Sequence, residues 1–436
     1  MDHPIRKIQL TAGLYALGLG LLFLTGCAKT RTLMPAPNIY QGPDAPGLFS
    51  ELQGELQSNE ADLLYVTDRK PETDENGQLA YGYGRSFSTA FGSAIVAIKP
   101  DMPWQDLERI SIELERSTKL TLQLKSIEER GRFVETPWPV LLVDQEIKFD
   151  PAILEQARLA ERAFQAEIRQ RLQIASKPEV VMFVHGFNTD FEYAAETLAE
   201  LWHFLGREHI PILYTWPAGR GGPTGYNYDR ESGEFTIFHL KNLLSRLADI
   251  REIEKIHLVA HSRGTDVLMS AVRELVMVCK AAGEDCRQRF RIENMILAAP
   301  DLDIEVVSQR FIAEHLGTEV GEVYVYTSQG DRAISLAERL FKSVGRMGRL
   351  APEDLPADKL KMMKKVQGVS IIELKQKVDQ TGHSYFHSSP EASSDLILTI
   401  RYGYRPGDPA GRPLKQVGPV FWMIEPGYPH SVKPGN

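Results

Sequence analysis

The sequence predicts an α/β protein in which a mostly parallel sheet is flanked by helices and preceded by a β-rich extension. From residue 180 onward, short apolar runs alternate with helix-like stretches, which is typical of a parallel sheet covered on both faces. Between 62 and 149, apolar and polar residues alternate in short segments, as in half-buried strands. The chain has 436 residues, 43% hydrophobic and 25% charged. This composition excludes a disordered, collagen-like or polytopic membrane protein.

The charge balance argues against nucleic acid as a partner. Lys and Arg number 50 and Asp and Glu number 58, which gives a formal net charge of −8. A protein with this balance has no global cationic field that would favour nucleic acid. We also find no basic stripe with interleaved aromatic residues, and therefore expect no nucleic-acid partner.

The N-terminus carries the pattern of a secretory signal peptide. A basic start precedes a nearly uncharged apolar run over 8–24, and small residues then lead to Cys27. The motif over 24–27 resembles a bacterial lipobox, in which the cysteine is diacylated and becomes the new N-terminus after cleavage. We therefore expect residues 1–26 to be a lipoprotein signal peptide and Cys27 to carry a lipid anchor. The alternative is a plain single-pass anchor, because an apolar run of this length could just span a tilted bilayer.

The residue after the cysteine bears on location. Ala28 follows Cys27, and no aspartate does, which by resemblance to Gram-negative sorting rules favours the outer membrane. The predicted location is therefore the bacterial cell envelope, with the chain lipid-anchored on the periplasmic face of the outer membrane.

Two regions precede the main domain. Residues 27–58 contain several prolines and glycines and little periodicity, which predicts a flexible, lipid-anchored tether without chemistry. Residues 59–150 are expected to form a β-rich region. The strands expected there are 63–67, 94–98, 110–114 and 120–124.

The main domain is expected over 151–402, and a Pro/Gly-rich tail over 403–436. Asp150 and Pro151 supply an N-cap and an N1 proline before apolar residues at helical spacing. The strand candidates that follow are 180–184, 212–215, 256–260, 295–299, 323–326 and 369–374, and the helix-like stretches are 190–206, 236–250, 263–281, 304–316 and 331–343. Ligands of open parallel sheets bind beyond the carboxyl ends of the strands, so we look for site residues just after each run.

A serine lies on a tight turn between an apolar run and a helix-like stretch. The run 256–260 leads into His-Ser-Arg-Gly over 261–264, with Ser262 in second place. Such a turn strains the backbone and pushes the serine Oγ out at the sheet edge. Ala260 replaces the first glycine of the usual G-x-S-x-G elbow, which exchanges one small residue for another. Ser262 is the candidate nucleophile; the alternative is a loop serine that caps the following helix.

The loop after 180–184 predicts an oxyanion hole. A nucleophile that attacks an acyl carbon needs two preorganised N–H donors, one from the residue after the serine and one from the loop after an earlier strand. By position these donors belong to Arg263 and Phe187. Gly186 would let the backbone approach the substrate oxygen, although it could instead merely tighten a turn.

An acid and a histidine follow the serine in the chain order expected for this chemistry. Asp331 and His383 each follow one of the last two apolar runs. Asp301 is the rival acid, and His387 is the rival base. Asp331 is preferred because it lies one strand later than Asp301, which is the commonest place for the acid in this fold. Its alternative role is helix N-capping. The alternative role of His383 is a structural hydrogen bond within a loop.

Taken in order, these motifs carry a resemblance. The stretch from 180 to 400 resembles the α/β-hydrolase fold, and motifs over 62–400 resemble a family of bacterial esterase/lipase-like hydrolases of unknown function. The motifs are Tyr65–Pro71, Val184–Asn188, Thr215–Pro217, Ala260–Gly264, Ala298–Asp301, Asp331–Ala333 and Gly382–Ser384. The resemblance implies a serine hydrolase triad at Ser262, Asp331 and His383, and it supplies no substrate. Ala260 and the long tail after 402 depart from the pattern.

A Gly-rich stretch after 212–215 is expected to form a loop that gates or lines an acyl pocket. Trp216 ends its strand on the expected catalytic side, and Tyr226 and Tyr228 follow within the stretch. The alternative is a solvated loop whose aromatic residues pack for structure. The glycines lack the lysine of a phosphate-binding loop.

We expect no metal and no organic cofactor. The cysteines are too few and the histidines too scattered for metal-ligand spacing. Beyond Cys27 only Cys279 and Cys286 remain. In an oxidising compartment these two could form a short-loop disulfide, which the sequence leaves open.

The sequence therefore predicts a lipid-anchored serine hydrolase that cleaves a small-molecule carboxylic ester through an acyl-serine intermediate. In this hypothesis Ser262 attacks, His383 transfers the proton and Asp331 orients His383. A thioester or an amide is a less favoured substrate. The alternative from another class is a non-catalytic envelope binding or scaffolding lipoprotein on the same fold. A third hypothesis is a lipase that acts on its own membrane, although no long apolar lid segment is obvious.

Overall fold

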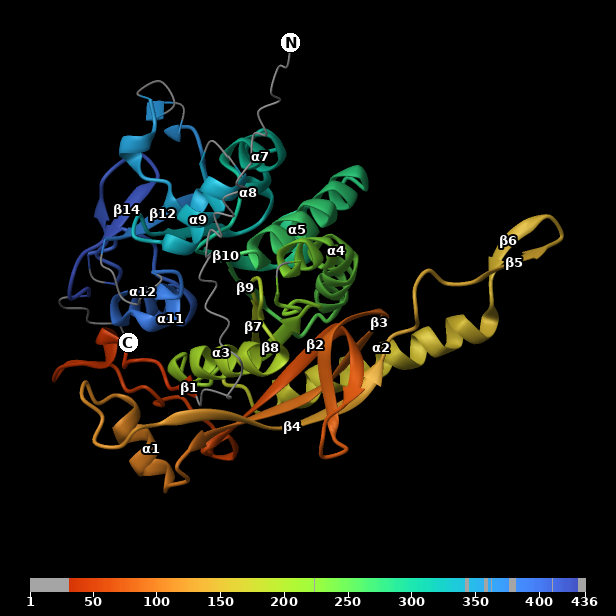
Figure 1. The fold of residues 1–436 in the computed structure, drawn as a ribbon, viewed down its shortest axis with the longest axis horizontal. Helices are drawn as coiled ribbons and strands as arrows, with labels where there is room; N and C mark the ends of the chain where they lie inside the picture. Colours follow the sequence, from red (N-terminus) through yellow and green to blue (C-terminus); the bar gives the residue numbers. More distant parts are fainter. Residues whose placement is uncertain are drawn as a thin grey trace, which may run out of the picture. The chain divides into compact units, whose positions relative to one another are not determined.

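The computed structural model contains one twelve-stranded sheet (Figure 1). It describes residues 31–429 apart from 223, 342–344, 357–359, 362, 376–381 and 410. The strand order is β1-β4-β3-β2-β8-β7-β9-β10-β11-β12-β14-β13. The eight strands from β2 across to β14 are parallel to their neighbours, and antiparallel strands extend the sheet at both ends.

The strands have the following bounds: β1 Arg31–Thr32, β2 Glu60–Thr73, β3 Leu79–Lys99, β4 Thr121–Arg132, β5 Val140–Val143, β6 Glu146–Phe149, β7 Glu179–Val184, β8 Ile210–Thr215, β9 Lys255–His261, β10 Ile292–Ala298, β11 Glu322–Thr327, β12 Val369–Leu374, β13 Lys415–Gln416 and β14 Phe421–Ile424. The helices are α1 Trp104–Ser111, α2 Pro151–Leu172, α3 Phe191–Phe204, α4 Gly225–Asp249, α5 Gly264–Ala281, α6 Cys286–Phe290, α7 Ile304–Val307, α8 Leu316–Glu319, α9 Arg332–Phe341, α11 Tyr385–Ser388 and α12 Pro390–Ile400. Strands β5 and β6 form a separate two-stranded sheet and project beyond α2 (Figure 1).

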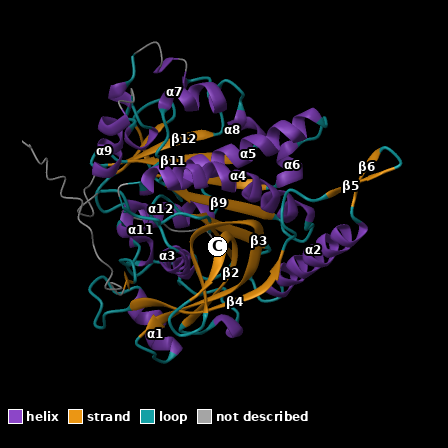
Figure 2. Cartoon of the chain, turned by 45° about the vertical axis from the view of Figure 1, so that its right-hand side comes forward, coloured by secondary structure: helices purple, strands orange, loops and turns teal. Residues whose placement is uncertain are grey.

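Helices cover both faces of the parallel sheet, as β7 illustrates. Its residues Val180, Met182 and Val184 belong to a hydrophobic cluster with α2, α4 and α5. The alternate residues, Val181 and Phe183, belong to a second cluster with α3 and α12. Because both faces are buried, such a strand is a continuous apolar run in the sequence. Figure 2 shows that α4 and α5 lie together and that α3 and α12 lie apart from them.

The predicted fold class is confirmed. All six apolar runs after residue 180 are strands, β7 to β12. Asp150 caps α2 by accepting a hydrogen bond from the backbone N–H of Ala152, as the sequence predicts. The stretch expected as one helix over 304–316 is instead α7 and α8, separated by a π-helical turn over Ser308–Ile312.

One predicted strand, 110–114, is wrong. Residues up to Ser111 belong to α1, in which Leu107, Ile110 and Ser111 are buried. This i, i+3, i+4 spacing is that of a helix face. The alternation of apolar and polar residues that suggests a strand begins only in the last turn of this helix.

The predicted flexible tether does not hold over 31–58. Strand β1 pairs with β4, and Leu33, Met34 and Ile39 are buried in the cluster that contains α3 and α12. The hydroxyl of Tyr40 donates to the carbonyl of Phe204 at 2.6 Å. The prolines and glycines of this segment mark turns of a chain that packs on the sheet without regular periodicity.

The C-terminal stretch after 402 also differs from a simple tail. Strand β14 pairs in parallel with β12 and so belongs to the main sheet. Arg412 is fully buried and forms an ion pair with Asp395 of α12 at 2.7 Å. The density of prolines and glycines hides a four-residue apolar run, Phe421–Ile424, that is long enough for a short strand between β12 and β13.

The predicted signal peptide and the predicted lipidation site at Cys27 lie outside the described residues. Within the described residues, no helix has the length and hydropathy needed to cross a bilayer. Cys279 and Cys286, which the sequence left open, form a disulfide with a Cα–Cα distance of 5.9 Å, and it joins α5 to α6.

Candidate active site

Ser262 occupies the turn between β9 and α5 in a strained backbone conformation. Its φ is +51°, a left-handed value that non-glycine residues seldom adopt. The turn lies directly against the loop that follows β7. A Cβ at Gly186 would lie 2.8 Å from the Cβ of Ser262, and a Cβ at Gly264 would lie 2.2 Å from the carbonyl oxygen of His185. Only glycine fits at these two positions, and the serine is thereby held at the carboxyl edge of the sheet.

A continuous hydrogen-bonded chain joins Ser262, His383 and Asp331. The Oγ of Ser262 lies 2.9 Å from Nε2 of His383, and Nδ1 of His383 lies 2.7 Å from Oδ2 of Asp331. A carboxylate only accepts, so Nδ1 carries the proton and Nε2 accepts from the serine hydroxyl. The other carboxylate oxygen of Asp331 accepts from the backbone N–H of Ile334 in α9 at 2.9 Å. Asp331 therefore caps a helix and binds the histidine at the same time.

The rival residues lie in other interactions. Asp301 forms a buried ion pair with Arg346 at 2.7 Å. His387 lies 3.1 Å from the Oε1 of Glu200, which also forms an ion pair with Arg31. The chain of contacts from Ser262 thus runs through His383 and Asp331 and not through Asp301 or His387.

Two aromatic side chains that sequence reasoning did not assign hold the His383 segment in place. The Nε2–H of His261 donates to the carbonyl oxygen of His383 at 3.1 Å, and the two rings lie 4.7 Å apart. Burial lowers the pKa of His261 well below its ordinary value, and the positive charge of His383 would lower it further. Tyr385 donates to the carbonyl of Tyr326 and accepts from the backbone N–H of Ala299. The His383 segment is therefore tied to the ends of β9, β10 and β11.

A fully buried arginine, Arg69, organises the loop after β7. It donates to the carbonyls of Thr189, Ala218 and Gly82 at 2.7 to 2.8 Å and to the hydroxyl of Thr215 at 2.9 Å. Burial lowers its pKa to about 10. Sequence reasoning included Arg69 in a motif without a role, because most of its acceptors are backbone carbonyls of segments far away in the chain.

His185 and Asp229 complete this support. Nε2 of His185 accepts from the backbone N–H of Trp216 at 3.0 Å. Oδ2 of Asp229 accepts from the backbone N–H groups of Asn188 and Gly219, at 2.9 and 3.2 Å. Burial lowers the pKa of His185 and raises the pKa of Asp229. Both residues link the loop after β7 to the loop after β8.

The predicted oxyanion donors belong to the two chain segments that meet at the serine. Arg263 directly follows Ser262, and its side chain forms an ion pair with Asp266 at 2.8 Å. Phe187 follows Gly186, whose position lies against Ser262. The side chain of Phe187 is 39% exposed, and its ring lies 5.4 Å from that of Tyr226.

The three aromatic residues predicted to line a pocket have different surroundings. Trp216 is fully buried, stacks on His185 at 5.1 Å and donates from Nε1 to the carbonyl of His185. Trp216 therefore holds the start of the loop that follows β7. Tyr226 and Tyr228 lie in the first turn of α4 and not in a loop. Tyr228 donates to the carbonyl of Tyr83, so only Tyr226 packs beside a predicted oxyanion residue.

Comparison with known proteins identifies a family for most of the residues that form this site. The model of a family described as "Alpha/beta hydrolase of unknown function (DUF900)" matches residues 160–401, more than half of the chain. Among solved structures, a lipase-esterase related protein from Clostridium acetobutylicum is similar at 12% identity with a TM-score of 0.22, covering 50% of this chain and 82% of that one. No curated protein matches the chain.

Proposed function

The chain belongs to this α/β-hydrolase family of unknown function, and from that premise we propose that it is a serine hydrolase that cleaves a carboxylic ester through an acyl-enzyme intermediate. The observation that carries the proposal is the hydrogen-bonded chain from the Oγ of Ser262 through His383 to Asp331. Along the sequence the three residues come in the order serine, acid, histidine, which is the order used on this fold.

The first half-reaction follows from the hydrogen bonds. Ser262 Oγ attacks the ester carbonyl carbon while Nε2 of His383 takes its proton, and Asp331 stabilises the imidazolium through Nδ1–H. The negative charge that develops on the carbonyl oxygen is held by the backbone N–H groups of Phe187 and Arg263. His383 then gives the proton to the alcohol, which leaves as the ester C–O bond breaks.

Water completes the cycle. His383 takes a proton from water, the hydroxide attacks the acyl carbon, and the proton returns to Ser262 Oγ as the carboxylic acid leaves. The described residues support a protected site for these steps, because Ser262 is 7% exposed and Asp331 is 1% exposed. The side chain of His383 is 16% exposed, which supports access to substrate and water.

The proposal includes a location. A lipid on Cys27 would hold the enzyme on the periplasmic face of the outer membrane. Labelling with a radioactive fatty acid tests this part, since a Cys27→Ser chain would take up no label. The hydrolase proposal does not depend on that result.

The decisive experiment uses the full chain in detergent and a panel of aryl esters of increasing acyl length. We expect the parent to hydrolyse at least the short esters and to react with a fluorophosphonate probe, whereas Ser262→Ala should lose both properties. His387→Gln is a matched control that removes a nearby histidine outside the hydrogen-bonded chain. If the folded parent neither reacts with the probe nor hydrolyses any ester, the fold serves a non-catalytic binding or scaffolding lipoprotein and the proposal fails.

A further inference from the structure

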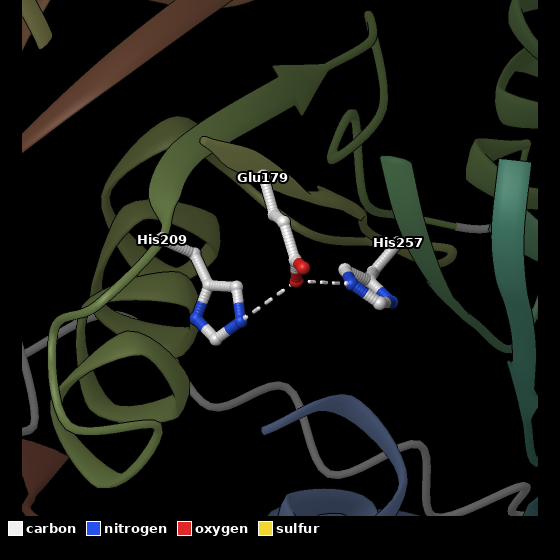
Figure 3. Close-up of side chains that lie close together, drawn as sticks. All are labelled: Glu179, His209 and His257. Carbon is white, nitrogen blue, oxygen red and sulfur yellow. Dashed lines mark hydrogen bonds and ion pairs between the residues drawn. The ribbon is translucent and has the colours of Figure 1, made fainter. Parts of the chain in front are cut away.

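A second cluster of ionisable side chains lies at the opposite edge of the same sheet. Glu179 is the first residue of β7, His209 directly precedes β8, and His257 lies near the start of β9. Because β8, β7 and β9 are adjacent and parallel, their amino ends bring the three side chains together. Figure 3 shows both imidazole rings pointing a nitrogen toward the carboxylate of Glu179. The two histidines are almost completely buried, at 1% and 2% exposure.

The spacing of the donor atoms is close to that of a metal site. Nε2 of His257 lies 3.0 Å from Oε2 of Glu179, and Nε2 of His209 lies 3.6 Å from the same oxygen. Tetrahedral ligands at zinc bond lengths near 2.1 Å are separated from one another by about 3.4 Å. The two measured distances bracket that value, and all three donor atoms lie within 4.8 Å of one another. Small side-chain movements would place them around one ion.

His209 provides an independent indication of a ligand. Among the described residues, neither of its ring nitrogens has a hydrogen-bond partner. The 3.6 Å from its Nε2 to Glu179 is too long for a hydrogen bond. A buried polar group without a hydrogen bond costs free energy, and a metal bond to Nε2 would compensate this cost.

The surroundings fit the way proteins orient metal ligands. Nδ1 of His257 lies 2.9 Å from the side-chain amide of Asn294. Rotating this amide by half a turn presents its oxygen, which would accept from Nδ1–H and leave Nε2 free to bind a metal. The other carboxylate oxygen of Glu179, Oε1, lies 3.4 Å from Nζ of Lys255, so one oxygen is held while the other faces the histidines.

We propose that Glu179, His209 and His257 bind one divalent transition-metal ion, with Zn²⁺ as the preferred occupant. Two imidazoles and one carboxylate are borderline ligands that suit zinc, and water completes a fourth position. The ion joins the starts of three adjacent strands and stabilises the sheet. His257 and Ser262 are five residue steps apart, about 16 Å for an extended chain, so the ion does not contact the reacting atoms.

The test measures metal binding directly and does not depend on hydrolase activity. The untagged full chain in detergent is stripped with a chelator and then titrated with Co²⁺, whose visible absorption reports low-symmetry nitrogen and oxygen coordination, and with Zn²⁺. We expect one tightly bound equivalent per chain. Glu179→Gln and His209→Ala should each weaken binding by at least about 100-fold. His315→Ala, which removes an exposed histidine elsewhere, is the matched control and should bind as the parent does.

Two results would overturn the proposal. One is a parent that binds no more metal than Glu179→Gln, and the other is loss of binding in His383→Gln with retention in Glu179→Gln. Glu179→Gln preserves size, so it keeps the test valid if His209→Ala fails to fold. Added Zn²⁺ should also raise the melting temperature of the parent and leave that of folded Glu179→Gln unchanged.

Discussion

The two edges of the central sheet hold histidine and carboxylate groups in different arrangements. At the carboxyl edge, both ring nitrogens of His383 lie within 2.9 Å of a partner, and the histidine side chain is 16% exposed. At the amino edge, His209 is fully buried and, within the described part of the chain, neither of its ring nitrogens has a hydrogen-bond partner. Strand β9 contributes to both edges, with His257 near its start and Ser262 just after its end.

The two arrangements favour different chemistry. A histidine with a donor on one side and a carboxylate on the other is prepared to transfer a proton. A buried histidine without a hydrogen bond, next to a second histidine and a carboxylate, is prepared to bind a cation. Substitutions at one edge that leave the other edge intact therefore test the two proposals independently.

The largest expected effect concerns the two histidines near the carboxyl edge. His383→Gln should lower kcat for an aryl ester by about 10⁴-fold or more, because the proton of Ser262 loses its acceptor. His387→Gln should change kcat by less than about 10-fold. Steady-state kinetics measure both values, and circular dichroism checks that both variants fold. Equal losses of kcat in the two variants would mean that the hydrogen bond to Ser262 does not show which histidine is the general base.

A smaller effect on kcat is expected from Asp229, which positions the loop that carries Phe187. Asp229→Ala removes the acceptor of the Asn188 and Gly219 backbone N–H groups. A displaced oxyanion loop should lower kcat by about 10- to 100-fold with little change in KM. Asp229→Asn keeps an acceptor oxygen and should recover most of the loss. If Asp229→Ala lowers the melting temperature and leaves kcat unchanged, the role of Asp229 is structural.

Removal of the metal should affect stability and leave catalysis unchanged. An ion present at 100 times its dissociation constant stabilises the folded state by about 2.7 kcal/mol, so a chelator should lower the melting temperature by several degrees. The rate of ester hydrolysis at 25 °C should not change. The Glu179→Gln chain should not respond to the chelator. A chelator that abolishes hydrolysis without changing the melting temperature would put an ion at the triad instead.

The sequence indicates which three residues meet at the carboxyl edge because their order along the chain follows the order of the strands. Ser262, Asp331 and His383 each come just after a buried strand, and strands of a parallel sheet end at one edge. The strand prediction fails at 110–114 because a helix end and a short strand share the same alternation of apolar residues. The packing of 31–58 is missed because its buried residues follow no period.

The amino edge could not be predicted from the sequence for a topological reason. Glu179, His209 and His257 are far apart in the chain, and no short motif relates them. They meet only because β7 lies between β8 and β9 in the sheet, so sheet order differs from chain order. The role of Arg69 is hidden for a similar reason, since most of its partners are backbone carbonyls that any residue supplies.

Substitution of Asp68 has the smallest expected effect on stability. Asp68 is a buried carboxyl group at the carboxyl edge of the sheet, whereas Glu179 lies at the amino edge. Asp68 follows Thr67, which pairs with Thr215 at the end of β8, and burial raises its pKa from 3.8 to about 7. Between these two values the folded chain holds a proton that the unfolded chain has lost, so stability falls as pH rises through this window. Asp68→Asn removes that loss.

The melting temperature of Asp68→Asn should therefore exceed that of the parent at pH 8, and the difference should shrink as the pH is lowered toward 5. Thermal unfolding at several pH values measures it, with Asp74→Asn, an exposed carboxyl on the same hairpin, as the control. A difference that stays constant with pH would mean that Asp68 is ionised in the folded chain, held by Arg69 and Arg85, whose charges lower its pKa. In that case the carboxyl edge, like the amino edge, would stabilise its buried carboxylate with neighbouring cations.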